Sequence, residues 1–242
     1  MANNVLLNNV THQDLKVLSR FGAEFGDNVG SVLAFPTEFV ELQKEYPILF
    51  KLNKKTEKYQ SIALLGLNQD ENLFLDSKSE SGWAANYIPA AVAKGPFLIG
   101  IQSQSSGESN EAMIHIDLDH AKVGHQDGHA LFLEHGGNSP YLEHIASLLN
   151  VIHQGVASQD LMFRIFLEMD LIEPVNIGFN LRSGEKFQLS GHYTINEEKL
   201  AQLDGEKLEK LSKLGFLPLA YAVIASMTNV RKLIDVKNRA LS

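Results

Sequence analysis

The chain has 242 residues, no cysteine, 44% hydrophobic residues and a formal net charge of −8. This composition is typical of a folded globular chain, and the lack of cysteine excludes disulfide bonds, thiolate zinc sites and cysteine nucleophiles. The acidic balance argues against nucleic acid as a partner, because such binding relies on Lys and Arg to neutralise phosphates.

Four elements are expected in the first third of the chain. They are helices at Leu15–Ser19 and Thr37–Glu45, a strand at Ile48–Leu52, and a hairpin over Ser61–Leu75. The N-terminus lacks the basic and apolar regions of a secretory signal, and no apolar run approaches the roughly 20 residues that span a bilayer. We therefore expect a cytoplasmic protein without a membrane span. Surface association by another export route stays open.

Two strands are expected in the centre of the chain, at Pro96–Gln102 and Met113–Leu118. The second alternates, with isoleucines on one face and His115 and Asp117 on the other, as in a half-buried strand. The Ser/Gly/Glu-rich stretch between them, Gln102–Glu111, is expected to be a mobile loop.

Most helices are expected after residue 139. Ser139 can cap, and Pro140 can open, a helix with an apolar stripe that runs to Val156. Further helices are expected at Leu161–Leu171, Asn196–Leu203, Glu206–Leu214 and from Pro218 towards Lys237. The apolar part of the last helix, Leu219–Met227, fits either the core or the seam of a homodimer.

One more hairpin is expected between these helices. Val175–Leu181 and Lys186–Tyr193 flank a turn in which Gly184 permits a positive φ. Together the elements predict an α+β fold, with a mostly antiparallel sheet in the N-terminal and central parts. Because no repeat or linker divides the chain, we expect a single domain over residues 1–242.

A histidine-rich stretch is the main candidate for chemistry. Five histidines between His115 and His135 alternate with carboxylates, a ligand mixture that suits Fe(II), Mn or Zn. His115 and Asp117 have the spacing of a two-histidine, one-carboxylate site, and His192 on a later strand is the candidate third ligand. The alternative is a solvated strand face on which these side chains bind nothing.

Aromatic side chains give a second candidate site. Trp83 and Tyr87 could line a ligand pocket or a protein interface, where aromatic residues contribute much of the binding energy. Trp83 follows a polar loop, so we expect it to be partly exposed. The alternative is packing in the core.

Several stretches together resemble the SapC family of bacterial proteins. They are residues 4–10, 39–50, 63–67, 71–75, 83–89, 96–100, 115–120, 136–143 and 193–198. The resemblance runs nearly end to end and supplies no catalytic residues. The family is named after a protein associated with a bacterial surface layer, and it is distinct from the peptide-transport permease of the same name. Some relatives are encoded near flavin-dependent halogenases and oxygenases, which implies an accessory role.

The sequence therefore favours a non-catalytic binding or accessory protein that acts on a protein partner or a small molecule. Two alternatives stay open. One is a metal-dependent, Fe(II) oxygenase-like enzyme that uses His115, Asp117 and His192. The other is a structural protein associated with the cell surface layer.

Overall fold

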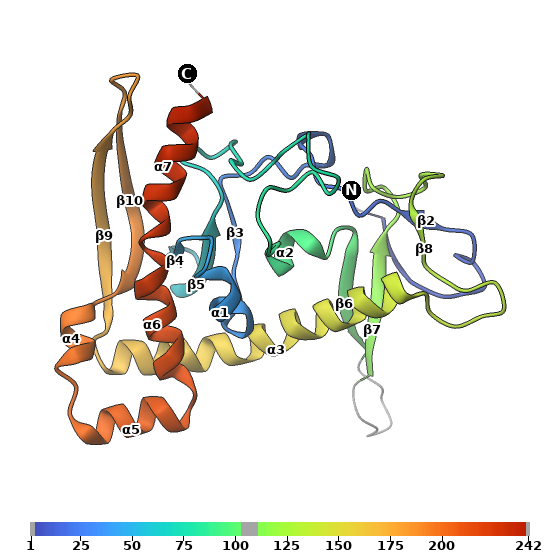
Figure 1. Cartoon of the computed structure of the whole chain (residues 1–242). Helices are drawn as coiled ribbons and strands as arrows, with labels where there is room; N and C mark the ends of the chain where they lie inside the picture. The colour runs from blue at the N-terminus through green and yellow to red at the C-terminus, as the bar shows by residue number, and fades with distance from the viewer. Residues whose placement is uncertain (1–2, 103–110, 241–242) are drawn as a thin grey trace. The chain divides into compact units, whose positions relative to one another are not determined.

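The structure is a computed structural model that describes residues 3–102 and 111–240 (Figure 1). Its internal contacts group into two compact units. Unit 1 takes the chain up to Asp27, Leu75–Ala84 and Ala90–His153. Unit 2 takes Asn28–Phe74, Ala85–Pro89 and the chain from Gln154 onward.

Unit 1 is built on two antiparallel sheets. Their strands are β1 (Asn4–Leu6), β7 (Glu111–Asp117) and β6 (Phe97–Gln102) in the first, and β2 (Lys16–Val17) and β8 (His129–Ala130) in the second. The short helices η1 (Ala23–Phe25) and α2 (Ala90–Ala93) and the first half of α3 (Pro140–Glu168) complete the unit. Ile116 of β7 is fully buried and packs with Phe97 and with Leu142 and Ile145 of α3. The expected alternation of β7 is confirmed.

Unit 2 is built on a five-stranded antiparallel sheet. The strand order is β3 (Ser31–Leu33), β5 (Lys58–Leu64), β4 (Ile48–Asn53), β10 (Lys186–Ile195) and β9 (Ile172–Asn180). The helices are η2 (Pro36–Glu38), α1 (Phe39–Leu42), the second half of α3, α4 (Glu197–Ala201), α5 (Gly205–Lys213), α6 (Phe216–Ser226) and α7 (Asn229–Ala240). The α+β fold class, with antiparallel sheets and helices later in the chain, is confirmed.

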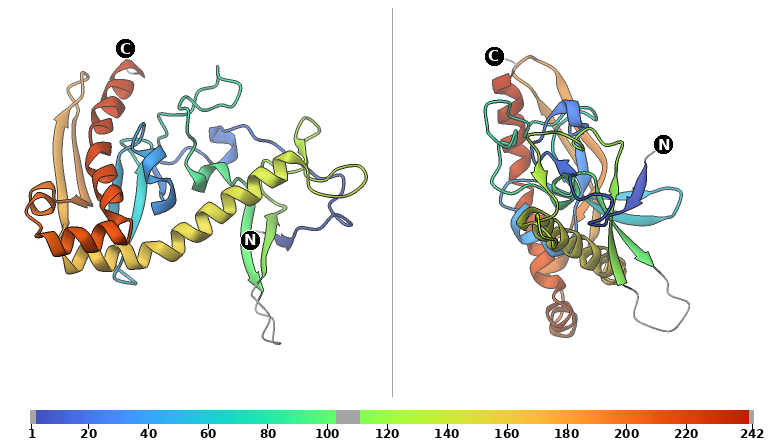
Figure 2. Two further views of the ribbon diagram at one scale, coloured as in Figure 1. Left: turned by 60° about the horizontal axis from the view of Figure 1, so that its bottom comes forward. Right: turned by 90° about the vertical axis from the view of Figure 1, so that its right-hand side faces the viewer.

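The sheet of unit 2 is covered on both faces. Phe50 packs edge-to-face on Phe163 of α3, with ring centroids 4.9 Å apart. On the opposite face, Leu49 joins a cluster with Leu189 of β10 and Leu233 of α7. Both views of Figure 2 show α7 running alongside the β9–β10 hairpin, in agreement with this cluster.

Four sequence predictions of elements need correction. Leu15–Ser19 contains the strand β2, not a helix. The hairpin is β4–β5, not Ser61–Leu75. Its turn forms without glycine, because the Asn53 side chain accepts a hydrogen bond from the Lys55 N–H and Glu57 takes a φ of 55°. The corrections concerning helices follow.

Helix α3 continues without a break through the predicted start of a second helix at Leu161. No proline interrupts it, and Gly155 lies where an added Cβ would meet Phe35 at 2.5 Å, so this glycine serves close packing instead of a helix end. The helix expected from Pro218 divides into α6 and α7. The loop expected at Gln102–Glu111 lies, apart from its two end residues, outside the described residues.

Candidate functional site

A cleft of about 510 Å³ lies in unit 2, between strand β10 and the loop that follows β5. Its volume is within the range of small-molecule sites in proteins, roughly 300–1,000 Å³. Its walls mix apolar and polar groups. The lining residues are Val29–Ser31, Lys51, Leu64, Gly66–Asp70, Phe187–Ser190 and His192.

Strand β10 lines the cleft because a β-bulge changes its course. The register with β9 shifts between Leu189 and His192, and Gly191 within the bulge takes a φ of 75° that favours glycine. On its other side β10 pairs with β4, within the described residues, only through Tyr193 and Phe50. The half of β10 beyond the bulge therefore has a strand partner on the β9 side alone, and its other edge lines the cleft.

The direction of the β10 backbone groups follows from the turn of the hairpin. The Leu181 N–H donates to the Glu185 carbonyl at 2.8 Å, which makes these two residues a hydrogen-bonded pair. Hydrogen-bonded and non-hydrogen-bonded pairs alternate in an antiparallel ladder. The backbone of Phe187 therefore bonds to β9, and the backbone of Gln188 does not. The N–H and C=O of Gln188 therefore point away from β9. Neither has a hydrogen-bond partner among the residues that the structure describes.

The backbone of the opposite wall of the cleft forms hydrogen bonds within that wall. The Gly30 N–H donates to the Gln69 carbonyl at 2.6 Å, and the Gly30 carbonyl accepts from Leu65 and Gly66. A Cβ added to Gly30 would lie 2.1 Å from the Asn68 carbonyl oxygen, so only glycine fits this close approach of two backbones. The backbone groups of Gly30 are thus satisfied within this wall, whereas those of Gln188 on the β10 edge have no partner among the described residues.

His192 supplies a neutral imidazole to the cleft. Burial lowers the pKa of His192 below its usual value, and the nearby charge of Lys51 lowers it further. The Nδ1 atom lies 3.0 Å from the Ser190 carbonyl, which can only accept. The neutral ring therefore carries its proton on Nδ1, and Nε2 is a hydrogen-bond acceptor. Nε2 and the ammonium of Lys51 give the cleft an acceptor and a cation.

The predicted metal ligands lie in both units. His115 and Asp117 are on β7 in unit 1, and His192 is on β10 in unit 2. Asp117 Oδ1 accepts from the Asn3 N–H at 2.9 Å and the Asp119 N–H at 3.2 Å, so this carboxylate holds the residue before β1 and the turn after β7. Within residues 3–102 and 111–240, no group of three His, Asp or Glu side chains is arranged to hold a metal ion. The three-residue metal site stays a prediction.

Trp83 is buried, in contrast to the exposure expected for it. Its side chain is 3% exposed and packs edge-to-face on Phe21, with ring centroids 5.6 Å apart. The chain pairs at this point through a bridge between Trp83 and Leu75. The polar loop before Trp83 folds back on the chain, and the hydroxyls of Ser79 and Ser81 donate to the Trp83 carbonyl. The local sequence does not reveal this arrangement.

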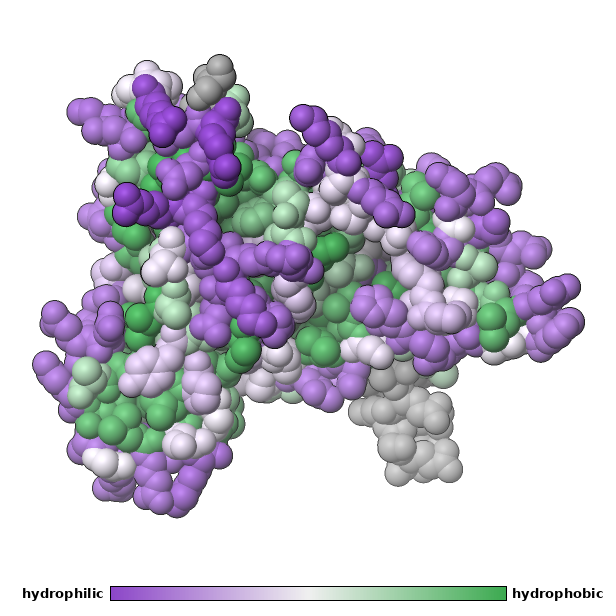
Figure 3. All heavy atoms as spheres, in the orientation of Figure 1, coloured by the Kyte–Doolittle hydropathy of each residue, from purple (hydrophilic) through white to green (hydrophobic). Residues whose placement is uncertain are grey.

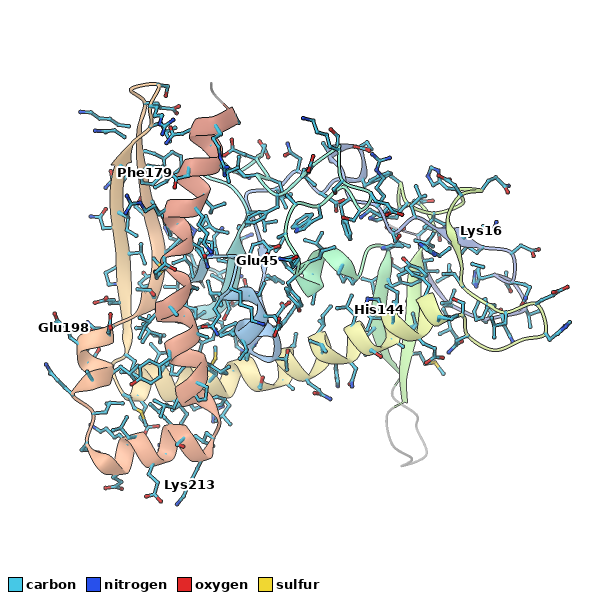
Figure 4. All side chains as sticks on the ribbon, viewed as in Figure 1. Lys16, Glu45, His144, Phe179, Glu198 and Lys213 are labelled. Carbon is cyan, nitrogen blue, oxygen red and sulfur yellow. The ribbon has the colours of Figure 1, made fainter. Side chains whose placement is uncertain are left out.

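Tyr87 is half-buried and belongs to unit 2, whereas Trp83 belongs to unit 1. The Tyr87 hydroxyl donates to Glu38 Oε2 at 2.8 Å, and the Tyr87 N–H donates to the carboxylate of Glu45, which is labelled in Figure 4. These bonds hold the segment Ala85–Pro89 against unit 2. The ligand-binding role predicted for Trp83 and Tyr87 stays a prediction.

The sequence reasoning selected His192 but missed the cleft around it. One signal was present, since a glycine inside a predicted strand, here Gly191, often marks a bulge. Lys51 and Gln188 carry no comparable signal, because the cleft forms between segments far apart in the chain.

Apolar side chains also gather on the surface of unit 2, over α4, α5 and α6 (Figure 3). The exposed large apolar residues of this segment are Leu214 and Tyr221. Most of α6 faces inward, with Phe216, Ala220 and Val223 buried. Within Leu219–Met227, Ala220, Ala222, Val223 and Ser226 are buried as expected for core, whereas Tyr221 and Ala225 are exposed. The homodimer seam stays a prediction.

Two further findings concern the chain as a whole. Among the described residues no helix by itself has the length and hydropathy to cross a membrane. Helix α5 and the segment Phe216–Ala240 have that length and hydropathy only when they are taken together, and they are bent by 94° where they meet. The sequence model of the SapC family matches residues 7–233. The chain belongs to the SapC family. No curated protein and no solved structure matches this SapC-family chain. The family match spans both units, from the residue after β1 into α7.

Proposed function

We propose that this SapC-family protein is a binding protein whose ligand occupies the cleft beside β10. The observation that carries the proposal is the unsatisfied backbone edge of β10 inside a cleft of about 510 Å³. The outward N–H and C=O of Gln188 lie on an exposed strand edge, and such an edge is a template on which an extended ligand can pair.

The groups in the cleft suit binding by complementary polar contacts. Lys51 can bind an acidic group, His192 Nε2 can accept a hydrogen bond, and Leu189 and Leu64 offer apolar contact. Each contact orients a ligand without changing its covalent bonds. A role as an accessory protein of a halogenase or oxygenase system, implied by the family resemblance, is compatible with such a site.

Binding can be tested by nuclear magnetic resonance with ¹⁵N-labelled protein and a library of small polar fragments. We expect some fragments to shift the amide signals of Gly66 and Gly191, and His192→Ala to weaken their binding about tenfold. His144→Ala, at an exposed position on α3 (labelled in Figure 4), is the matched control. Fragments that bind only outside the cleft would contradict the proposal.

The metal-dependent enzyme is the alternative, and elemental analysis separates the two. Protein purified without a histidine tag is analysed for iron, manganese and zinc, as wild type and as His115→Ala. Stoichiometric metal that is lost in His115→Ala would replace the binding proposal with the enzyme. The surface-layer role is tested by cell fractionation, in which a protein found only in the cytosol would contradict it.

A further inference from the structure

We propose that the free edge of β10 pairs with an extended segment of a partner protein, which adds a strand to the sheet of unit 2 within the cleft. This inference rests on the proposed function and specifies the ligand as a peptide. The segment has mixed charge, with an acidic side chain for Lys51 and a basic one for Asp70.

The first argument is the backbone pattern of β10. Strand addition needs an edge residue with both its N–H and its C=O directed outward, and Gln188 meets this requirement. The neighbouring residues Phe187 and Leu189 bond to β9 and direct their side chains, with Phe179, into the apolar cluster. Phe179, labelled in Figure 4, lies in this half of the hairpin. Phe187 and Leu189 therefore hold β10 to β9 and to the apolar cluster, while the backbone N–H and C=O of Gln188 are directed away from β9.

The second argument is the wall that faces this edge. The wall made by Val29–Ser31 and Gly66–Asp70 stands across the cleft from β10, and its backbone is bonded to itself. The cleft of about 510 Å³ between this wall and β10 is where the added segment would lie. A second folded copy of the chain, which would need an open edge to pair β10 with β10, does not fit this arrangement as well.

The third argument concerns charge. None of the ion pairs among the described residues involves Lys51, although its ammonium is close enough to His192 to lower the pKa of that side chain. Asp70 lines the other wall and is exposed. One cation and one anion on opposite sides favour a segment that carries both charges over a uniformly charged one.

The test uses the full chain and a displayed library of random seven-residue peptides. We expect enriched peptides with an acidic residue, and we expect Lys51→Met to weaken the binding of a synthetic copy about tenfold. Methylation of the peptide backbone nitrogens one at a time should weaken binding at alternate positions only, which is the signature of strand pairing.

A matched pair of variants tests the edge itself. Gln188→Pro removes the N–H that faces the cleft and leaves the ladder with β9 intact, whereas Gln188→Ala keeps the backbone unchanged. We expect Gln188→Pro to weaken the peptide about tenfold and Gln188→Ala to leave it unchanged. Circular dichroism checks that both variants fold. If Gln188→Pro does not fold, the methylation series alone decides.

Three results would overturn the inference. They are a library without enriched peptides, an enriched peptide that tolerates methylation at every position, and a dimer in sedimentation that Gln188→Pro abolishes. If fragments bind the cleft and no peptide does, the inference of a peptide ligand is overturned and the proposed function is retained. Failure of both fragments and peptides would remove the two proposals together.

Discussion

The hydroxyl of Tyr87 donates a hydrogen bond of 2.8 Å to the carboxylate of Glu38, a side chain that is 2% exposed. The other carboxylate oxygen of Glu38 accepts from the Phe35 N–H at 3.0 Å, at the start of η2. Together these bonds connect a segment that follows β5 by about twenty residues to the helical turn before β4. They place a buried acid at a structural junction.

Tyr87→Phe tests this junction. The substitution removes one hydrogen bond to a buried charged acceptor, so we expect a loss of about 2 kcal/mol in the free energy of unfolding, measured in urea. Tyr221→Phe removes a hydroxyl from a side chain that is 52% exposed and is the control. Equal stability of the two variants would show that the Tyr87 bond contributes nothing.

Alkaline pH should destabilise unit 1 through Tyr141. Burial raises the pKa of the Tyr141 hydroxyl to about 12, above its usual value of 10.0. The folded state therefore favours the neutral hydroxyl, and this contribution is present below pH 10 and is lost as the pH rises towards 12. Between pH 9 and 11 the free energy of unfolding should fall more in the wild type than in Tyr141→Phe. Parallel curves would contradict the prediction.

The stability of unit 1 should depend on Lys122 and Asp27 both being present as an ion pair. The Lys122 side chain is 2% exposed, and its ammonium lies 3.0 Å from Asp27 Oδ2 and over the ring of Phe21. Asp27→Asn removes the negative charge beside a buried cation, and we expect it to cost about 3 kcal/mol. The double variant Asp27→Asn, Lys122→Met should regain much of that loss in thermal unfolding. A double variant no more stable than Asp27→Asn would contradict this account.

The bulge in β10 should depend on glycine at position 191. Its φ of 75° strains any other residue although no atom lies within 4 Å of an added Cβ, so Gly191→Ala should cost about 1 kcal/mol. Gly178 on β9 is the matched control, because it has equal space without a left-handed backbone. Gly178→Ala should be neutral in urea denaturation. The same loss in both variants would show that the backbone conformation at position 191 is not the cause.

Local signals predicted much of the fold. Ser139 accepts from the Leu142 N–H at 3.2 Å and caps α3 as expected, and Gly184 has the φ of 87° expected for the turn of the last hairpin. These features depend on residues only a few positions apart. The β4–β5 hairpin was misplaced because its turn uses Asn53 and Glu57 without a glycine.

The candidate site was less accessible to sequence reasoning. The sequence singled out His192 as a candidate third metal ligand, but its neighbours in the cleft come from residues 29–31, 51, 64 and 66–70. No periodicity or motif reports that β10 leaves β4 after one residue pair. Such information depends on the path of the chain in space.

The wall across from β10 also bears on how this protein avoids aggregation. A long strand edge with free amide groups is a template on which identical strands can stack into fibrils. The close approach of Gly30 and Gly66 to their neighbouring backbone keeps that wall in place. Bulkier residues at these two glycines would displace the wall, and fibril growth from the uncovered hairpin would then be the expected form of misfolding.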